Sequence, residues 1–291
     1  RDRSMFFPLD YVSELRQIGS HDSVLIFGVE NIKELRIVKK LISSKTKAII
    51  ICNPNNPTGY LYSKEELEAL KTLCLKYDLF LFSDEAYREF CYDGRSFISP
   101  MHLEGLEENV IVMDTVSKRY SACGARLGCL ITKNKAVMNA ALKFAQARLS
   151  PGMIPQLAGE AAVNTPDSYF EEVNKEYTQR RDILVNRLNE MEGVYCPNPG
   201  GAFYVVARLP IDDADAFCQW ILEKFDYQNQ TVMMAPATGF YSTAGAGKNE
   251  VRLAYVLNTQ DLQNAMDCLE KALADYPGRK LEENAFMSGR A

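Results

Sequence analysis

The first half of the chain alternates short apolar runs with segments in which apolar residues recur every three or four positions. The recurring pattern predicts one helix over residues 31–42, opened by a capping box of Asn31 and Glu34, and a second helix opened by Ser63 and Glu66. Continuous apolar strands between amphipathic helices indicate a parallel or mostly parallel sheet covered on both faces. Five runs predict its strands, at residues 23–27, 46–53, 79–83, 110–114 and 126–132.

The second half of the chain has a different pattern, in which a long charged helix precedes shorter strands and helices. Helices are expected at residues 133–149, 169–192, 213–225 and 259–275, and strands at 200–207, 232–235 and 250–256. We therefore predict an α/β protein with a three-layer α/β/α large domain and a smaller C-terminal α+β domain. The expected segments are an atypical N-terminal part (1–37), the large domain (38–168), an interdomain helix with the small domain (169–281), and a polar tail (282–291).

The composition is ordinary for a soluble globular protein, with 47% hydrophobic and 24% charged residues among 291. Acidic and basic residues are interspersed and the net charge is −5, so we expect no nucleic-acid partner. No apolar run is long enough to span a bilayer, and the start of the chain lacks the pattern of a secretory signal. We therefore expect no membrane partner.

The cysteines and histidines limit the chemistry further. The eight cysteines contain no CxxC pair and several lie inside apolar runs, which favours free thiols in a reduced, cytoplasmic setting over a disulfide framework. The two histidines, His21 and His102, do not have the spacing of metal ligands. We expect no metal site, and a Ser-His-Asp triad is disfavoured.

Two polar segments follow the strands expected at residues 46–53 and 79–83. The first is N-P-N-N-P-T-G at residues 53–59, a restricted turn that could aim the Asn56 amide at a ligand or could be a plain turn. The second contains Asp84 and Tyr87, which could reach one ligand from the same loop. The alternative for Asp84 is the N-cap of a helix.

Two further segments carry cationic side chains. Lys118 follows the apolar run at 110–113 and is flanked by Thr115, Ser117 and Arg126, a set suited to an amine beside a bound phosphate. The alternative is a surface lysine in a basic loop. Arg252 alternates with apolar neighbours and could bind a carboxylate through its guanidinium fork, or it could be a solvated strand residue. Ligands gather at the carboxyl ends of strands in open α/β sheets, so the occurrence of all four features together is informative.

With these motifs in this order, the chain resembles the fold-type I, pyridoxal-phosphate-dependent class I/II aminotransferases, most closely the bacterial aspartate aminotransferase-like group. Residues 53–59 match the N-P-x-N-P-T-G segment of that family, and residues 83–87 match its x-D-E-x-Y segment. Residues 115–128 match S-x-S-K-x-x-x-x-x-G-x-R-x-G, with Thr115 in place of the usual Ser. The resemblance covers roughly residues 38–278.

The resemblance implies a role for each candidate residue. Lys118 resembles the lysine that forms the Schiff base with pyridoxal 5′-phosphate and later moves the α-proton, and Asp84 would pair with the pyridine nitrogen. The other assignments concern the ring oxygen, the phosphate and the substrate: Asn56 and Tyr87 to the ring 3-oxygen, Thr115, Ser117 and Arg126 to the phosphate, and Arg252 with Asn56 to the substrate.

The implied activity is transfer of an amino group between an amino acid, of aspartate or glutamate type, and a 2-oxo acid by a ping-pong Schiff-base mechanism. The implied assembly is a homodimer. Two alternatives remain open: another fold-type I pyridoxal-phosphate enzyme such as a C–S lyase, and a truncated remnant acting as a non-catalytic module.

Residues 1–37 depart from the family pattern. Relatives carry a Gly-rich turn that opens a phosphate-binding helix and an aromatic residue that stacks on the pyridine ring, whereas this segment offers only Gly19 and Gly28. A helix N-terminus is a strong phosphate anchor. We therefore expect weakened cofactor binding in a chain that lacks the usual N-terminal portion.

Overall fold

The computed structural model describes residues 23–27, 38–241 and 243–281. The chain divides into two compact units, Arg1–Asn174 with Gly200–Ala202 and Lys175–Pro199 with Phe203–Ala291. Of the helix predicted over residues 31–42, residues 38–41 are helical, while its start lies outside the described residues. His21, Gly19 and Gly28 lie outside them as well.

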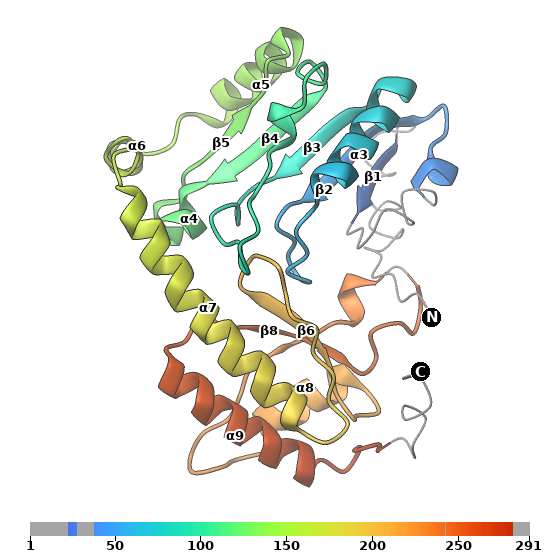
Figure 1. The fold of residues 1–291 in the computed structure, drawn as a ribbon, viewed down its shortest axis with the longest axis vertical. Coiled ribbons are helices and arrows are strands. Elements are labelled where there is room, and N and C mark those ends of the chain that lie inside the picture. The colour runs from blue at the N-terminus through green and yellow to red at the C-terminus, as the bar shows by residue number, and fades with distance from the viewer. Residues whose placement is uncertain (1–22, 28–37, 242, 282–291) are drawn as a thin grey trace. The chain divides into compact units, whose positions relative to one another are not determined.

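The first unit is built on a five-stranded sheet in the order β1-β2-β3-β4-β5 (Figure 1). The first four strands are parallel and β5 is antiparallel to β4, so the expected mostly parallel α/β sheet is confirmed. The strands lie within one or two residues of the predicted runs: β1 (Ser23–Phe27), β2 (Thr46–Cys52), β3 (Phe80–Asp84), β4 (Val110–Thr115) and β5 (Gly128–Ile131).

Helix α3 (Lys64–Tyr77) begins where the sequence predicts it. The Ser63 hydroxyl accepts a hydrogen bond from the Glu66 amide at 3.3 Å, and the Glu66 carboxylate accepts one from the Ser63 amide at 2.8 Å. Such a capping box satisfies two amides that the helix cannot pair, and losing the cap costs about 1 kcal/mol. The helix ends at Asp78, whose left-handed backbone lets its amide bond Cys74.

The core of the first unit lies between α3 and one face of the sheet. Burying one large aliphatic side chain of this core contributes about 1.5–3 kcal/mol to the free energy of unfolding, so this layer accounts for much of the unit's stability. Its fully buried members alternate along the strands and recur along the helix, among them Ile49 and Ile51 of β2, Leu81 of β3, and Leu67 and Leu70 of α3.

The segment after β4 differs from the predicted pattern in two ways. The strand predicted from Arg126 begins at Gly128, because Arg126 has a left-handed backbone (φ 53°) that a strand does not accommodate. Two helices follow β5, α5 (Lys135–Arg148) and α6 (Met153–Ala162), and neither contains a buried residue. Helix α6 was not predicted from the sequence pattern.

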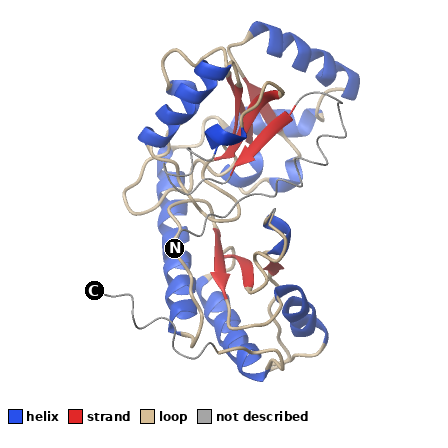
Figure 2. Ribbon diagram, turned by 90° about the vertical axis from the view of Figure 1, so that its right-hand side faces the viewer, coloured by secondary structure: helices blue, strands red, loops and turns tan. Residues whose placement is uncertain are grey.

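The second unit contains a three-stranded antiparallel sheet in the order β6-β8-β7 with helices beside it, as the strands and helices in Figure 2 show. The expected smaller α+β unit is therefore present. The strand predicted at 232–235 is wrong in its placement: only the residues of β7 (Ala235–Pro236) pair, and Pro236 has no amide with which to extend the ladder. The division between the two units falls within α7 (Asp167–Glu190). The remaining elements are β6 (Tyr204–Arg208), α8 (Ala214–Glu223), β8 (Glu250–Ala254) and α9 (Thr259–Asp275).

The described residues contain neither a candidate membrane span nor a candidate metal centre. None of the helices there combines the length and the apolar character that a membrane crossing requires. Within the same residues no three His, Cys, Asp or Glu side chains are grouped so that they could hold a metal ion.

Candidate active site

Three polar segments meet at the edge of the first unit's sheet where its parallel strands end. In the register of the sheet, Cys52 at the end of β2 lies beside Asp84 at the end of β3, and Asp84 lies beside Met113 of β4. The turn or loop that follows each strand therefore starts from the same edge. Open α/β sheets bind ligands outside the carboxyl ends of their strands, so this edge is the candidate site.

The turn after β2 is held by hydrogen bonds of its own backbone and side chains. The Asn53 amide donates to the Asp84 carbonyl at 2.9 Å, which ties the turn to the end of β3. The Asn55 side-chain oxygen accepts from the amide and the hydroxyl of Thr58 at 3.2 and 3.1 Å. Asn56 lies between these fixed points, so the backbone on either side of it is restrained.

Asn56 and Tyr87 come together although they follow different strands. The Asn56 side-chain amide donates to the Tyr87 hydroxyl at 3.4 Å. The Tyr87 side chain is buried, whereas Asn56 is half-buried. The structure therefore joins the two side chains for which the sequence predicts a common ligand oxygen.

Asp84 is the last residue of β3 and carries a carboxylate with a raised pKa. Its Oδ1 accepts a hydrogen bond from the Ala86 amide at 3.1 Å, within a turn and not at the start of a helix, so the helix-cap interpretation is wrong. Burial is the largest cause of the raised pKa of Asp84, and the nearby charge of Asp114 raises this pKa further. No lysine, arginine or histidine among the described residues forms an ion pair with Asp84. A cationic ligand group would therefore find an uncompensated carboxylate here.

Lys118 lies on α4 (Val116–Arg119), a single helical turn that directly follows β4. Thr115 caps this turn: its hydroxyl accepts from the Ser117 amide at 3.1 Å, donates to the Leu127 carbonyl at 2.9 Å, and lies 2.8 Å from the Ser117 hydroxyl. The structure thus brings Thr115 and Ser117 together and holds the turn that carries Lys118, which is half-buried.

Arg126 lies at the far end of the same loop and is exposed. Its guanidinium donates to the Cys123 carbonyl at 3.0 Å, so among the described residues it bonds its own loop and forms no hydrogen bond with Thr115 or Ser117. The neighbouring Gly128 is required by close packing, because a Cβ there would lie 2.9 Å from the Asp114 carbonyl oxygen.

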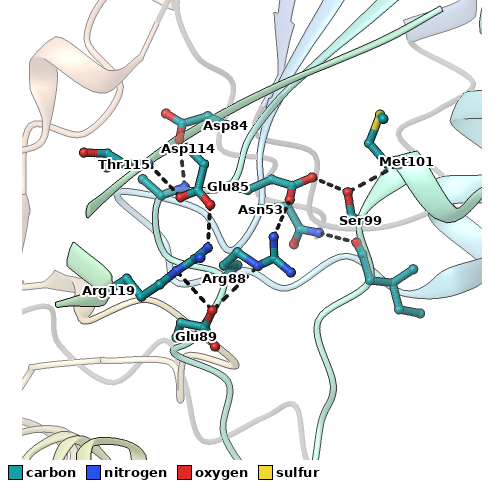
Figure 3. A network of polar contacts seen from close by, with 12 residues as sticks. Asn53, Asp84, Glu85, Arg88, Glu89, Ser99, Met101, Asp114, Thr115 and Arg119 are labelled. Atoms are coloured by element: carbon teal, nitrogen blue, oxygen red, sulfur yellow. Dashed lines mark hydrogen bonds and ion pairs between the residues drawn. The ribbon is translucent and has the colours of Figure 1, made fainter. Parts of the chain in front are cut away.

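A network of charged side chains that no sequence motif indicated lies beside this edge, as Figure 3 shows. Glu85 is fully buried and accepts a hydrogen bond from the Ser99 hydroxyl at 2.6 Å, while Arg88 lies 3.6 Å from its other oxygen. Burial raises the pKa of Glu85, and the bonds from Ser99 and the charge of Arg88 oppose that rise. The loop that carries Asp84 and Tyr87 is thus fixed by a buried acid next in sequence to Asp84.

The same network reaches α4 through Arg119. Its guanidinium pairs with the Asp114 carboxylate, and its Nε lies 3.1 Å from Glu89 (Figure 3). Asp114 is the residue before Thr115, and Arg119 is the residue after Lys118. Their positions next to motif residues were the signal that the sequence offered for this network. Which charged groups pair with each other follows only from the register of the sheet.

Arg252 belongs to the second unit, where it lies on the central strand β8 between β6 and β7. Its guanidinium carbon lies 4.8 Å from the centre of the Tyr204 ring and 5.2 Å from that of Phe240. The residue is half-buried, so it is not a fully solvated strand arginine. Contact with two rings restrains the plane of the guanidinium, which favours recognition of a carboxylate by two parallel hydrogen bonds.

Comparisons with known proteins place this geometry in context. The family model described as "Aminotransferase class I and II" matches residues 31–269. An aspartate aminotransferase of Bacillus subtilis is 32% identical over 242 residues, which are 80% of this chain and 59% of that relative. An aromatic-amino-acid aminotransferase of Thermococcus litoralis is 34% identical over 243 residues, or 82% of this chain and 60% of the relative. The chain thus spans less than two thirds of the curated relatives it matches.

Solved structures give the same result. An aromatic aminotransferase from Pyrococcus horikoshii superposes with a TM-score of 0.73 at 30% identity, over 84% of this chain and 63% of that one. Thermus thermophilus aspartate aminotransferase with maleate superposes with a TM-score of 0.72 at 29% identity, over 82% of this chain and 60% of the other.

Proposed function

The chain belongs to the class I and II aminotransferases, and from this we propose that it moves an amino group between an amino acid and a 2-oxo acid with pyridoxal 5′-phosphate as cofactor. One observation carries the proposal: the ends of β2, β3 and β4 bring Asn56, Asp84 and Lys118 to the same edge of one sheet. An amide, an uncompensated carboxylate and an amine at one edge suit a ligand with a ring nitrogen, a ring oxygen and an aldehyde.

The residues at this edge fit that cofactor on its ring side. The uncompensated Asp84 carboxylate suits a protonated pyridine nitrogen, and the paired Asn56 and Tyr87 suit the ring oxygen. The phosphate side is supported by fewer groups. The Thr115 hydroxyl already donates to the Leu127 carbonyl, and Arg126 bonds Cys123, so Ser117 is the phosphate ligand that the local bonds support best.

When bound, pyridoxal phosphate supplies an aldehyde carbon and a ring that withdraws electrons from the substrate Cα. Lys118 would hold the cofactor covalently through its amine and carry the proton that leaves Cα. Asp84 would keep a proton on the ring nitrogen, while Asn56 and Tyr87 fix the tilt of the ring by hydrogen bonds. Arg252 would bind the α-carboxylate of the substrate.

We propose aspartate or glutamate as the amino donor. Several of the matched relatives are named aspartate aminotransferases, while others are named for aromatic amino acids. All of these names describe aminotransferases, so the C–S lyase alternative is not favoured. The domain limits 38–168 and 169–281 are part of the same proposal. We also propose a cytoplasmic setting, which the free state of all eight cysteines supports.

The proposal is tested by loading the purified chain with pyridoxal phosphate, reducing it with borohydride, and mapping the added mass by peptide mass spectrometry. We expect the label on Lys118 and a visible absorbance band that borohydride removes. Turnover of aspartate should then require an added 2-oxo acid. A label spread evenly over exposed lysines would contradict the proposal, and product release without a 2-oxo acid would indicate a lyase.

The proposed homodimer is supported by an unusual stretch of exposed apolar side chains on β5, α5, α6 and the residues directly after α5 and α6, which adjoin along the chain at one edge of the first unit (Figure 1). If a fully exposed large side chain presents roughly 200 Å², these side chains together expose on the order of 1,000 Å², comparable in area to one side of a stable interface. Its members are Leu130, Ile131, Met138, Leu142, Phe144, Leu149, Met153, Ile154, Leu157 and Val163.

We expect the chain to sediment as a dimer and the double change Phe144→Glu with Ile154→Glu to convert it to a monomer. Both side chains are 77% exposed, so the substitutions should not disturb the fold, but each would bury a charge in the interface. Analytical ultracentrifugation measures the outcome, and Leu75→Glu, an exposed position on α3, is the control. A monomeric unmodified chain, or a dimer that survives both changes, would contradict the dimer.

A further inference from the structure

Arg119 connects three segments of the candidate site. Its guanidinium pairs with Asp114 at the end of β4, and its Nε lies 3.1 Å from a Glu89 oxygen in the loop after β3 (Figure 3). Arg119 is itself the last residue of α4, directly after Lys118. One side chain therefore links the turn that carries Lys118 to the loop that begins at Asp84.

Asp114 brings a second carboxylate close to Asp84. In the sheet Asp84 lies beside Met113, so the two acids stand at the ends of neighbouring strands, and Figure 3 shows them close together. The Asp114 side chain is 8% exposed; one oxygen accepts the Thr115 amide at 2.7 Å and the other takes Arg119. Arg119 is thus the cation in direct contact with a nearly buried acid.

Other charged and titratable groups surround this pair, so the charge of Asp114 acts on several neighbours. It contributes to the raised pKa of Asp84 and of Glu85. It also contributes to the raised pKa of Cys129 on β5, a rise that the charges of Arg119 and Arg88 oppose. On the opposite side, burial and Asp84 raise the pKa of Cys52 to about 12, so that thiol stays neutral.

We propose that Arg119 is a positioning residue of the site, which neutralises Asp114 beside Asp84 and ties α4 to the Asp84 loop. The proposal rests on the proposed function, in which an ionised Asp84 holds the proton on the cofactor's ring nitrogen. Two neighbouring carboxylates disfavour each other's ionisation unless a cation compensates one of them. A guanidinium suits the task because its fork can contact two carboxylates at once.

The alternative is that Arg119 is a plain ion pair that stabilises the fold. A role of that kind would lower the melting temperature without changing the ionisation of Asp84. The titration of Asp84 therefore separates the two roles. It can be measured in the chain without cofactor, so failure of this inference and failure of the aminotransferase proposal are distinguishable.

The experiment labels the aspartate carboxyl carbons with ¹³C and follows the Asp84 resonance, assigned by its loss in Asp84→Asn, as pH is varied. Arg119→Met should raise the midpoint of the Asp84 titration by about one pH unit, the effect of one uncompensated charge at an intermediate dielectric. Adding Asp114→Asn to Arg119→Met should return the midpoint to the unmodified value or below, because Asn still accepts the Thr115 amide but carries no charge.

Arg187→Met is the matched control, since Arg187 also bridges carboxylates, those of Glu190, Asp267 and Glu270, but does so in the second unit. It should leave the Asp84 midpoint unchanged. If Arg119→Met does not fold, the single change Asp114→Asn decides, and it should lower the midpoint. An unchanged Asp84 midpoint in folded Arg119→Met, or in Asp114→Asn, would overturn the inference.

A second measurement addresses the link to Lys118. Under equal, subsaturating pyridoxal phosphate, borohydride labelling of Lys118 should fall several-fold in Arg119→Met and recover in part in Arg119→Lys, which restores the charge without the fork. Labelling that is equal in all three chains would overturn the positioning of α4, whatever the titration shows.

Discussion

Lys118→Ala is expected to abolish covalent attachment of pyridoxal phosphate and to lower transamination by at least about 10⁴-fold, the upper range for loss of a positioned acid–base group. The substitution should leave the fold intact, because alanine suits the helical turn α4 and the capping bonds of Thr115 involve the backbone and Ser117. Lys118 would supply both the attaching amine and the proton carrier, so one change removes both functions.

Borohydride reduction followed by peptide mass spectrometry measures the attachment, and coupled turnover of aspartate measures the activity. Lys133→Ala is the control, since Lys133 is exposed and lies just beyond the end of β5. It should keep both the label and the activity. If Lys118→Ala retained a stoichiometric label at one other lysine together with turnover, Lys118 would not be the attachment site.

Asp84→Asn is expected to lower activity by about 10²–10³-fold, in the range for loss of one preorganised electrostatic partner, and at the same time to stabilise the cofactor-free chain. Asparagine keeps the oxygen that accepts the Ala86 amide but cannot stabilise a protonated ring nitrogen. A gain in stability with a loss of activity is typical of a residue kept for function at a cost to folding.

The sign of the stability change follows from linkage. Burial and Asp114 raise the pKa of Asp84 in the folded chain, so the folded state binds this proton more tightly than the unfolded state. Stability is therefore lost as pH rises from the unfolded pKa through the raised folded pKa, and the loss persists at neutral pH. Asp84→Asn removes it, and we expect the melting temperature at pH 7 to rise by a few degrees.

Melting curves at pH 7 and below the unfolded pKa of aspartate check this expectation, because the difference between the two chains should vanish at the lower pH. Asp275→Asn, at the exposed end of α9, should show no such pattern. Equal melting temperatures of Asp84→Asn and the unmodified chain at pH 7 would mean that ionised Asp84 is compensated in the folded state.

Local signals in the sequence predicted much of the fold. The capping box of Ser63 and Glu66 opens α3 as predicted, and α9 has the predicted bounds, because cap and periodicity are encoded within a few residues. Helix α6 was missed because Gly152 and Pro155 interrupt the pattern at its start. The paired strand β7 is shorter than its apolar run, since pairing depends on a neighbour that sequence does not show.

The candidate site was predictable only where a motif fixes chemistry and chain order together. Asn56, Asp84 and Lys118 lie at or just after the ends of consecutive parallel strands, and the ends of such strands meet at one edge of a sheet. The bond between Asn56 and Tyr87, and the pairing of Arg119 with Asp114 and Glu89, depend on strand register and loop course. Arg126 differs from these residues, since its motif position predicts a phosphate ligand and its guanidinium bonds the Cys123 carbonyl in the described structure, a bond that the motif does not predict.

The open edge of β5 bears on the protein's abundance in a cell. Beyond β4, β5 has no further neighbour in the described sheet, and Leu130 and Ile131 on it are 39% and 42% exposed. An apolar edge strand is a template for pairing with any other extended chain, so newly made molecules stay exposed to aggregation until the edge is covered. We therefore expect the steady-state level of this chain to fall when this edge stays uncovered, because chaperones and proteases act on the uncovered form.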